Sequence, residues 1–131
     1  NIEAKAMLDI AGKDLIPAVM KYIGDLSATV EHMHGVMKLL GEPEDFSDKA
    51  EVKRLRDCVS LLNEMQDALE KLEIIRAEVR SIEDLRERAV QMHAKVVPAM
   101  DALRAPADKL EMIVDRSYWP MPSYGDLMFE V

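Results

Sequence analysis

The sequence predicts an all-α protein: an elongated antiparallel three-helix bundle of long, proline-kinked helices, with an extended C-terminal arm. The first observation is composition, because the 131 residues include only five glycines and six prolines, while good helix formers such as Ala, Leu, Met and Glu are abundant. The second is a repeat of apolar residues at steps of three and four. The third is that this rhythm stops near the C-terminus, where four of the six aromatic residues gather. We therefore expect a bundle over 1–117 and an arm over 118–131.

The first helix is predicted over about 2–40. Gly41 followed by Pro43 supplies the expected stop, because glycine adopts the left-handed conformation at a helix end and proline cannot continue the helix. The acidic stretch 42–46 then forms a short turn. Apolar or small residues fall on one face of this helix, at positions 4, 8, 11, 15, 19, 22, 26, 30, 33, 37 and 40.

Two further helices, over about 48–80 and 83–116, continue the same rhythm. Asp48 begins a capping-box-like pattern at the start of the second helix. Ser81 with Asp84 offers a similar start for the third, although no glycine or proline separates these two helices. Each helix is about 45–60 Å long at about 1.5 Å per residue, and the connecting turns are short. The three helices must therefore run up, down and up.

Pro17, in LIPAVM, and Pro98, in VVPAMD, each interrupt a predicted helix. An interior proline lacks the N–H group that would bond to the carbonyl four residues back, and its ring clashes with that carbonyl, at a cost of about 3 kcal/mol. Because the first and third helices run parallel, the two kinks could fall at one height and let both helices bend around the second. The alternative is two independent breaks, with Gly12 and Asp14 ending one helix and capping the next.

The charge balance restricts the classes of partner. The formal net charge of -8 and the isoelectric point near 4.9 argue against nucleic acids and anionic membranes as partners, because proteins that bind either concentrate Lys and Arg.

No apolar run approaches the length of about 18 residues that a membrane-spanning helix needs, and the first residues lack the order of a secretory signal. A single cysteine, Cys58, fits a reducing compartment. We therefore expect a cytoplasmic protein, and the start at Asn1 in place of Met predicts a piece of a longer chain.

No familiar catalytic or nucleotide-binding motif is present, so we expect no catalytic, cofactor-binding or metal-binding residue in this chain. Glu31 and His34 form a single E-x-x-H, the half-motif of di-metal carboxylate bundles, but such a site needs four helices and only three are predicted. His32 and His34 are two residues apart, so they point in nearly opposite directions from a helix and cannot hold one ion. His93 is expected to flank the core, and Cys58 to behave as a small buried hydrophobic residue.

The C-terminal arm is the candidate interaction site. Pro120 and Pro122 force an extended path, because each proline also disfavours helix in the residue before it. Fixing the backbone costs about 1–2 kcal/mol per residue, so we expect the arm to be ordered only where a partner surface covers it. In an isolated monomer, amides over 117–131 should exchange rapidly. The predicted contact residues are Tyr118, Trp119, Pro120, Pro122, Tyr124, Leu127 and Phe129.

The arm also carries a resemblance to a known family. Its WPMPSYGDLMFEV is similar to the carboxy-terminal signature of type III glutamine synthetases, in which W-P-x-P-x-Y-x-D-L-[LIM]-F closes the chain. Two upstream segments, EAKAMLDIAGKDLIPAVMKY at 3–22 and PAMDALRAPADKLEMIVD at 98–115, resemble parts of the same family that follow its catalytic domain. The resemblance thus touches both ends of the chain in order, whereas the predicted second helix adds little to it.

The resemblance implies a parent enzyme that makes glutamine from glutamate and ammonia, using ATP and a divalent metal, Mg²⁺ or Mn²⁺, in an assembly of many identical subunits. The family's catalytic residues lie in the preceding domain, so this chain is expected to be inert by itself. Its expected partners are its own upstream catalytic domain and neighbouring identical subunits, in a structural, subunit-contact or regulatory role. The alternative is a freestanding helical adaptor whose end, 129–131, is captured by a partner groove. A metal or redox bundle enzyme comes third, because the ligand count is poor.

Overall fold

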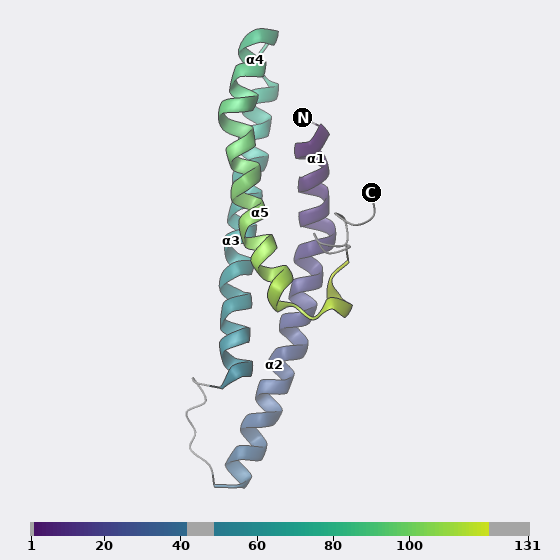
Figure 1. Cartoon of the computed structure of the whole chain (residues 1–131), viewed down its shortest axis with the longest axis vertical. Coiled ribbons are helices and arrows are strands. Elements are labelled where there is room, and N and C mark those ends of the chain that lie inside the picture. Colours follow the sequence, from purple (N-terminus) through teal and green to yellow (C-terminus); the bar gives the residue numbers. More distant parts are fainter. Residues whose placement is uncertain (1, 42–48, 121–131) are drawn as a thin grey trace.

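The computed structural model describes residues 2–41 and 49–120, and every regular element in them is helical. The predicted all-α class and the three long helical segments are confirmed (Figure 1). The first segment joins α1, the π-helical turn η1 and α2; the second is α3; the third joins α4, the π-helical turn η2 and α5, before a short 3-10 turn, η3. Their bounds are, in chain order, Ile2–Asp9, Ile10–Leu15, Ile16–Leu39, Ala50–Arg80, Leu85–Gln91, Met92–Val96, Val97–Ile113 and Arg116–Tyr118.

Local sequence determines where these helices end. Gly41 has a φ of 74°, a left-handed conformation that glycine adopts without a steric penalty, and it follows the end of α2 as predicted. α4 begins at a cap on Asp84, whose Oδ1 accepts a hydrogen bond from the backbone N–H two residues on, at 3.0 Å. Ser81 instead terminates α3, and its hydroxyl donates to the carbonyl of Glu78 at 2.6 Å. Asp48, the predicted cap of the second helix, lies outside the described residues.

The two interrupting prolines do not break their helices. Each follows a π-helical turn, η1 before Pro17 and η2 before Pro98, and the residues that flank these turns keep right-handed helical conformation. In both cases the residue before the proline donates its N–H to the carbonyl five residues back. This wider turn relieves the clash between the proline ring and the carbonyl four residues back. The alternative of two separate helices, with Gly12 and Asp14 at the junction, is therefore wrong.

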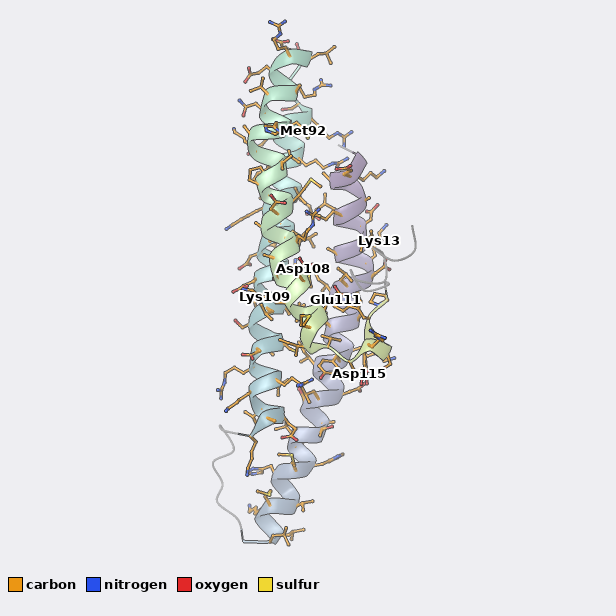
Figure 2. The ribbon with its side chains drawn as sticks, in the orientation of Figure 1. Lys13, Met92, Asp108, Lys109, Glu111 and Asp115 are labelled. Atoms are coloured by element: carbon orange, nitrogen blue, oxygen red, sulfur yellow. The ribbon has the colours of Figure 1, made fainter. Side chains whose placement is uncertain are left out.

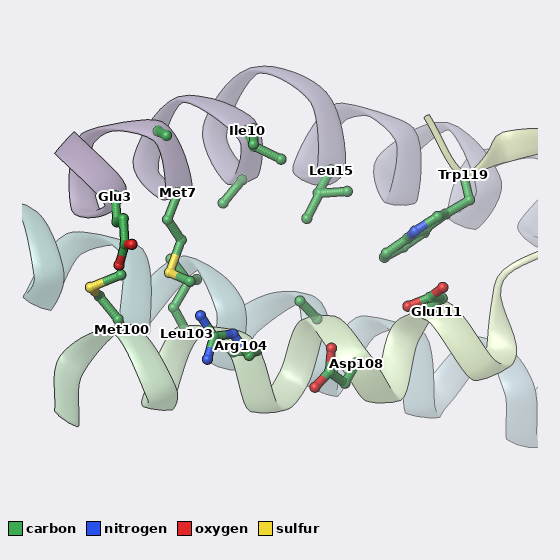
Figure 3. A pocket seen from close by; sticks show the side chains of 13 residues that line it. Glu3, Met7, Ile10, Leu15, Met100, Leu103, Arg104, Asp108, Glu111 and Trp119 are labelled. Atoms are coloured by element: carbon green, nitrogen blue, oxygen red, sulfur yellow. The ribbon is translucent and has the colours of Figure 1, made fainter. Parts of the chain in front are cut away.

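The two π-helical turns lie at different heights along the molecule. Figure 2 shows Met92, the first residue of η2, near one end of the long axis, and Lys13, within η1, much nearer the middle. In agreement, Glu3 in α1 lies across a groove from Met100 in the first turn of α5 (Figure 3). The expectation of two kinks at one height is thus wrong, because the third segment is offset along the first. A third proline, Pro106, lies inside α5 and is buried.

The core lies where α3 is packed by both other segments. α3 contacts α5 most extensively, then α2, and it contacts η2 and α1 less. Figure 1 shows α5 beside α3, with α1 and α2 forming a segment that is tilted relative to both. Burying a large apolar side chain contributes about 1.5–3 kcal/mol. The largest fully buried side chains come from all three segments and are Val19, Cys58, Met65, Leu72, Val79, Val96, Leu103 and Leu110.

A second region, the distal end, extends beyond the end of α5, and the third segment contacts it through Ile113 and Tyr118. We define it as residues 23–41, which are the second part of α2 and the two residues after it, together with 50–57 of α3. α5 ends at Ile113, and the chain then turns toward α2 in place of following α3 to its first residues (Figure 1). None of the distal-end residues is buried, and Val36 and Leu39 are exposed. The remaining described part of the molecule is called the body below.

Candidate interaction surface

The end of the third segment is held in place by a series of hydrogen bonds. α5 gives way to extended backbone at Val114. Arg54 of α3 donates from Nη1 to the carbonyl of Ile113 at 3.1 Å. Asp115 caps η3, because its Oδ1 accepts from both the backbone N–H and the hydroxyl of Ser117, each at 2.9 Å. These hydrogen bonds favour the carboxylate and lower the pKa of Asp115 below its ordinary value.

Tyr118, the first residue of the predicted arm, packs on the first segment of the same chain. Its ring meets the ring of Tyr22 edge to face, with centroids 5.3 Å apart and planes at 70°. Its hydroxyl donates a hydrogen bond to Oδ2 of Asp25 on α2. This hydrogen bond favours the protonated phenol, so it raises the pKa of Tyr118 above its ordinary value. A contact across 93 residues therefore joins the end of the third segment to the first.

Trp119 lies at one end of a groove between the first and third segments. The groove has a volume of about 500 Å³ and is open to solvent. Figure 3 shows the indole between the two helices, with Glu3 and Met100 at the opposite end. The other apolar side chains that line it are Ala6, Met7, Ile10, Ala11, Leu15, Leu103 and Ala107.

Charged side chains also border this groove. Three of them are acidic, Glu3, Asp108 and Glu111, and one is basic, Arg104. Arg104 is exposed and lies 3.4 Å from Oδ1 of Asp101 on the same helix, a contact of the kind that adds a few tenths of a kcal/mol at most. The groove is therefore apolar in its lining and net negative in charge.

Comparison with known proteins identifies what this chain is similar to. No protein-family model matches it. It is 24% identical over 130 residues to the type-3 glutamine synthetase of Dictyostelium discoideum, and 26% identical over 133 residues to a glutamine synthetase of Bacteroides fragilis. Each alignment covers 98% of this chain and 17% of the relative. A glutamine synthetase of Butyrivibrio fibrisolvens is 25% identical over 131 residues, which cover 100% of this chain and 18% of the relative.

The chain resembles a region of type III glutamine synthetases. The resemblance predicted from the sequence is thereby confirmed, and it extends along the whole chain, the second helix included. The chain spans less than a fifth of the length of these glutamine synthetases. The similarity therefore concerns only the aligned region of each relative, and the rest of each relative has no counterpart in this chain.

The structure places three of the seven predicted contact residues. Tyr118 and Trp119 are half-buried and pack against the core, and Pro120 is exposed. Their contact with a neighbouring domain or subunit stays a prediction, since what the structure shows is a contact within one chain. The other four lie outside the described residues, and they are Pro122, Tyr124, Leu127 and Phe129.

Sequence reasoning missed the partners of the arm and the groove beside it. The receiving residues Tyr22 and Asp25 are three apart on the first segment, so they share a helix face. That spacing is the only local signal, because an aromatic residue and a carboxylate at this distance are common on any helix. The groove gives no local signal, since its lining comes from helices about ninety residues apart in the chain.

The candidate metal ligands lie at the surface, whereas the cysteine is buried. Glu31, His32 and His34 are exposed on α2, and His93 is exposed in η2. Over residues 2–41 and 49–120, no three His, Cys, Asp or Glu side chains gather closely enough to hold a metal ion. These residues therefore do not fit the divalent metal that the glutamine synthetase resemblance implies for the parent enzyme. Cys58 is fully buried, and desolvation raises the pKa of its thiol.

Among the described helices, none combines the length and the apolar character needed to cross a bilayer.

Proposed function

We propose that this chain is the helical C-terminal domain of a type III glutamine synthetase and that the domain is not catalytic. One observation carries the proposal: similarity spans nearly all of this chain but less than a fifth of each glutamine synthetase it matches. A region of this length is of ordinary domain size. In this proposal the parent is a cytoplasmic homo-oligomer of glutamine biosynthesis, which ligates ammonia to glutamate with ATP and Mg²⁺ or Mn²⁺ in its upstream catalytic domain.

The role we propose within the parent is architectural, as an antiparallel helical bundle that contributes subunit contacts or transmits regulation. The body supports this role, because its buried side chains are apolar and none of the described polar or charged residues is buried. The distal end supports it as well. Val36, Leu39 and Leu40 are 55%, 88% and 71% exposed there, and a cluster of apolar side chains is unfavourable in water. These residues suit a surface that the rest of the enzyme covers.

The contact role is tested in the full-length parent enzyme with Trp119→Ala. This change removes the indole from the end of the groove, so we expect a lower melting temperature and loss of subunits from the assembly, measured by scanning fluorimetry and mass photometry. Met112→Ala is the matched control, because Met112 lies in the last turn of α5 and is 86% exposed. Equal melting temperatures and equal oligomer masses for the two variants would contradict the contact role.

The identity is tested separately. We expect the coding sequence immediately upstream of Asn1 to encode a glutamine synthetase catalytic domain in frame, and an unrelated domain there would favour the freestanding adaptor. The purified 131-residue chain should form no glutamine from glutamate, ammonia and ATP. Activity of this chain alone would overturn the non-catalytic assignment.

A further inference from the structure

We propose that the groove between the first and third segments binds residues 121–131 of the same chain. The groove is apolar, open and about 500 Å³ in volume, and water contact with such a lining is unfavourable. Trp119 lies at one end of it, so residues 121–131 begin where the groove begins (Figure 3). This inference concerns the chain itself and does not depend on the identity of the parent enzyme. It replaces the expectation that amides over 121–131 exchange rapidly in an isolated monomer.

The length of residues 121–131 is sufficient for this path. The groove extends along the first segment from Leu15 to Glu3, a rise of about 18 Å at about 1.5 Å per residue. Eleven extended residues reach about 36 Å at about 3.3 Å per residue. Pro122 also disfavours helix at Met121, which favours a chain laid along a groove over one that continues as a helix.

The composition of the segment matches the lining of the groove. Met7 and Met100 line the groove, and flexible thioether side chains adapt to apolar partners of different shape. The groove can therefore accommodate large apolar side chains of different shapes. The segment MPSYGDLMFEV contains six of them: Met121, Tyr124, Leu127, Met128, Phe129 and Val131.

Covalent linkage favours this occupant over a separate partner. A segment tethered by a few residues to the end of its binding groove has an effective concentration on the order of millimolar. A separate peptide of the same chemistry would need a comparable free concentration to compete with it. The first residues of the arm already lie on their own chain, because Tyr118 contacts Tyr22 and Asp25 of the first segment and Trp119 lines the groove.

The charges indicate that apolar contact, and not ion pairing, drives the docking. The groove is bordered by three acidic residues and by Arg104 alone among basic ones, and the segment carries Asp126 and Glu130. Like charges repel, and dissolved salt screens this repulsion over distances of about 10 Å at 0.1 M. Docking should therefore tighten as the salt concentration rises, which is the opposite of a charge-driven contact.

The first experiment uses Trp119, which is the only tryptophan of the chain, so that intrinsic fluorescence reports on this groove. The full chain is compared with a chain truncated after Pro120. We expect truncation to shift the emission to longer wavelength and to raise quenching by acrylamide. A synthetic peptide of residues 121–131, added at millimolar concentration, should reverse both changes in the truncated chain. Raising the salt concentration should lower quenching in the full chain.

The second experiment fills the groove in the full chain. Ala6→Arg places a long side chain into the groove from an exposed position of α1, and Ala102→Arg, exposed on α5 outside this groove, is the matched control. Hydrogen exchange with mass spectrometry should show amides of 121–131 exchanging about tenfold faster in Ala6→Arg than in Ala102→Arg, a factor equivalent to about 1.4 kcal/mol. Circular dichroism checks that both variants are helical. If either variant is not helical, the fluorescence comparison of the full and truncated chains still tests the proposal.

Three results would overturn the proposal. One is emission and quenching that do not change on truncation. Another is protection of 121–131 that appears only at concentrations where the chain dimerises, because the segment would then lie on a second copy. The third is docking that weakens as salt is added, because ion pairs would then supply the contact.

Discussion

The body and the distal end share one sequence pattern but differ in burial. In the body, where α3 is flanked by both other segments, Val19, Met65 and Leu72 are fully buried. In the distal end, the same apolar stripe continues, yet Val30 and Met33 are only half-buried and none of its residues is buried. The period of three and four selects which helix face is apolar, but a third helix is needed to remove that face from water.

The largest expected effect breaks the body and leaves the distal end intact. Leu72→Ala deletes a fully buried side chain and leaves a cavity, so we expect a loss of about 2–5 kcal/mol in the free energy of unfolding, measured by urea denaturation. Leu39→Ala is the counterpart in the distal end, where the side chain is 88% exposed, and should change this value by less than about 0.5 kcal/mol. Similar losses from both changes would mean that the two regions do not differ in packing.

An intermediate effect sharpens the comparison within the distal end. Gly35 is helical, and a methyl group added there would meet nothing within 4 Å, so Gly35→Ala should stabilise α2 by about 0.5–1 kcal/mol. Because the distal end has no buried residue, we expect it to open locally. The gain should then appear as slower amide exchange over 24–39, with little change in global unfolding.

Gly41→Ala provides the opposite control for that prediction. Its φ of 74° is unfavourable for alanine by about 1–2 kcal/mol, so amide exchange at the end of α2 should become faster. For Gly35→Ala, the free energy of global unfolding and the free energy of local opening from amide exchange could instead rise by the same amount. That result would show that the distal end and the body unfold as one unit.

The smallest expected effect concerns the point where the third segment leaves α3. Tyr118→Phe removes the hydroxyl that donates to Asp25 but keeps the ring on Tyr22. The pKa of Tyr118 is raised in the folded chain, so the stability from this group is present below the ordinary tyrosine pKa of about 10 and is lost as pH rises through the folded value. The melting temperature of the unmodified chain should exceed that of Tyr118→Phe at pH 8, and the difference should vanish in strong alkali. If the difference in melting temperature between the two chains did not change with pH, the result would argue against the hydrogen bond.

The helical class and several helix ends could be predicted from neighbouring residues. Gly41 ends α2 and Asp84 caps α4 for reasons that lie within a few residues of each. The path through Pro17 could not be predicted, because a missing hydrogen bond can be accommodated by a break, a kink or a π-helical turn. Leu15 and Val19, on either side of this proline, are both buried in the same core, and a continuous helix keeps both there.

The candidate site shows the same division. The aromatic residues of the arm could be singled out from composition and proline spacing alone, and Tyr118 and Trp119 do make tertiary contacts. Their partners could not be predicted, because Tyr22 and Asp25 lie more than ninety residues away and carry no distinguishing local signal.

By itself, the sequence determined the helical state of the chain, the apolar face of each helix and the resemblance to type III glutamine synthetases, since these depend on residues within a few turns or on a short motif. The tertiary structure alone decided which parts of those faces are buried, how far the third segment is offset from the first, and where a groove opens beside Trp119. Such features depend on which helices lie next to each other, and a repeat shared by all three helices carries no information about their relative positions.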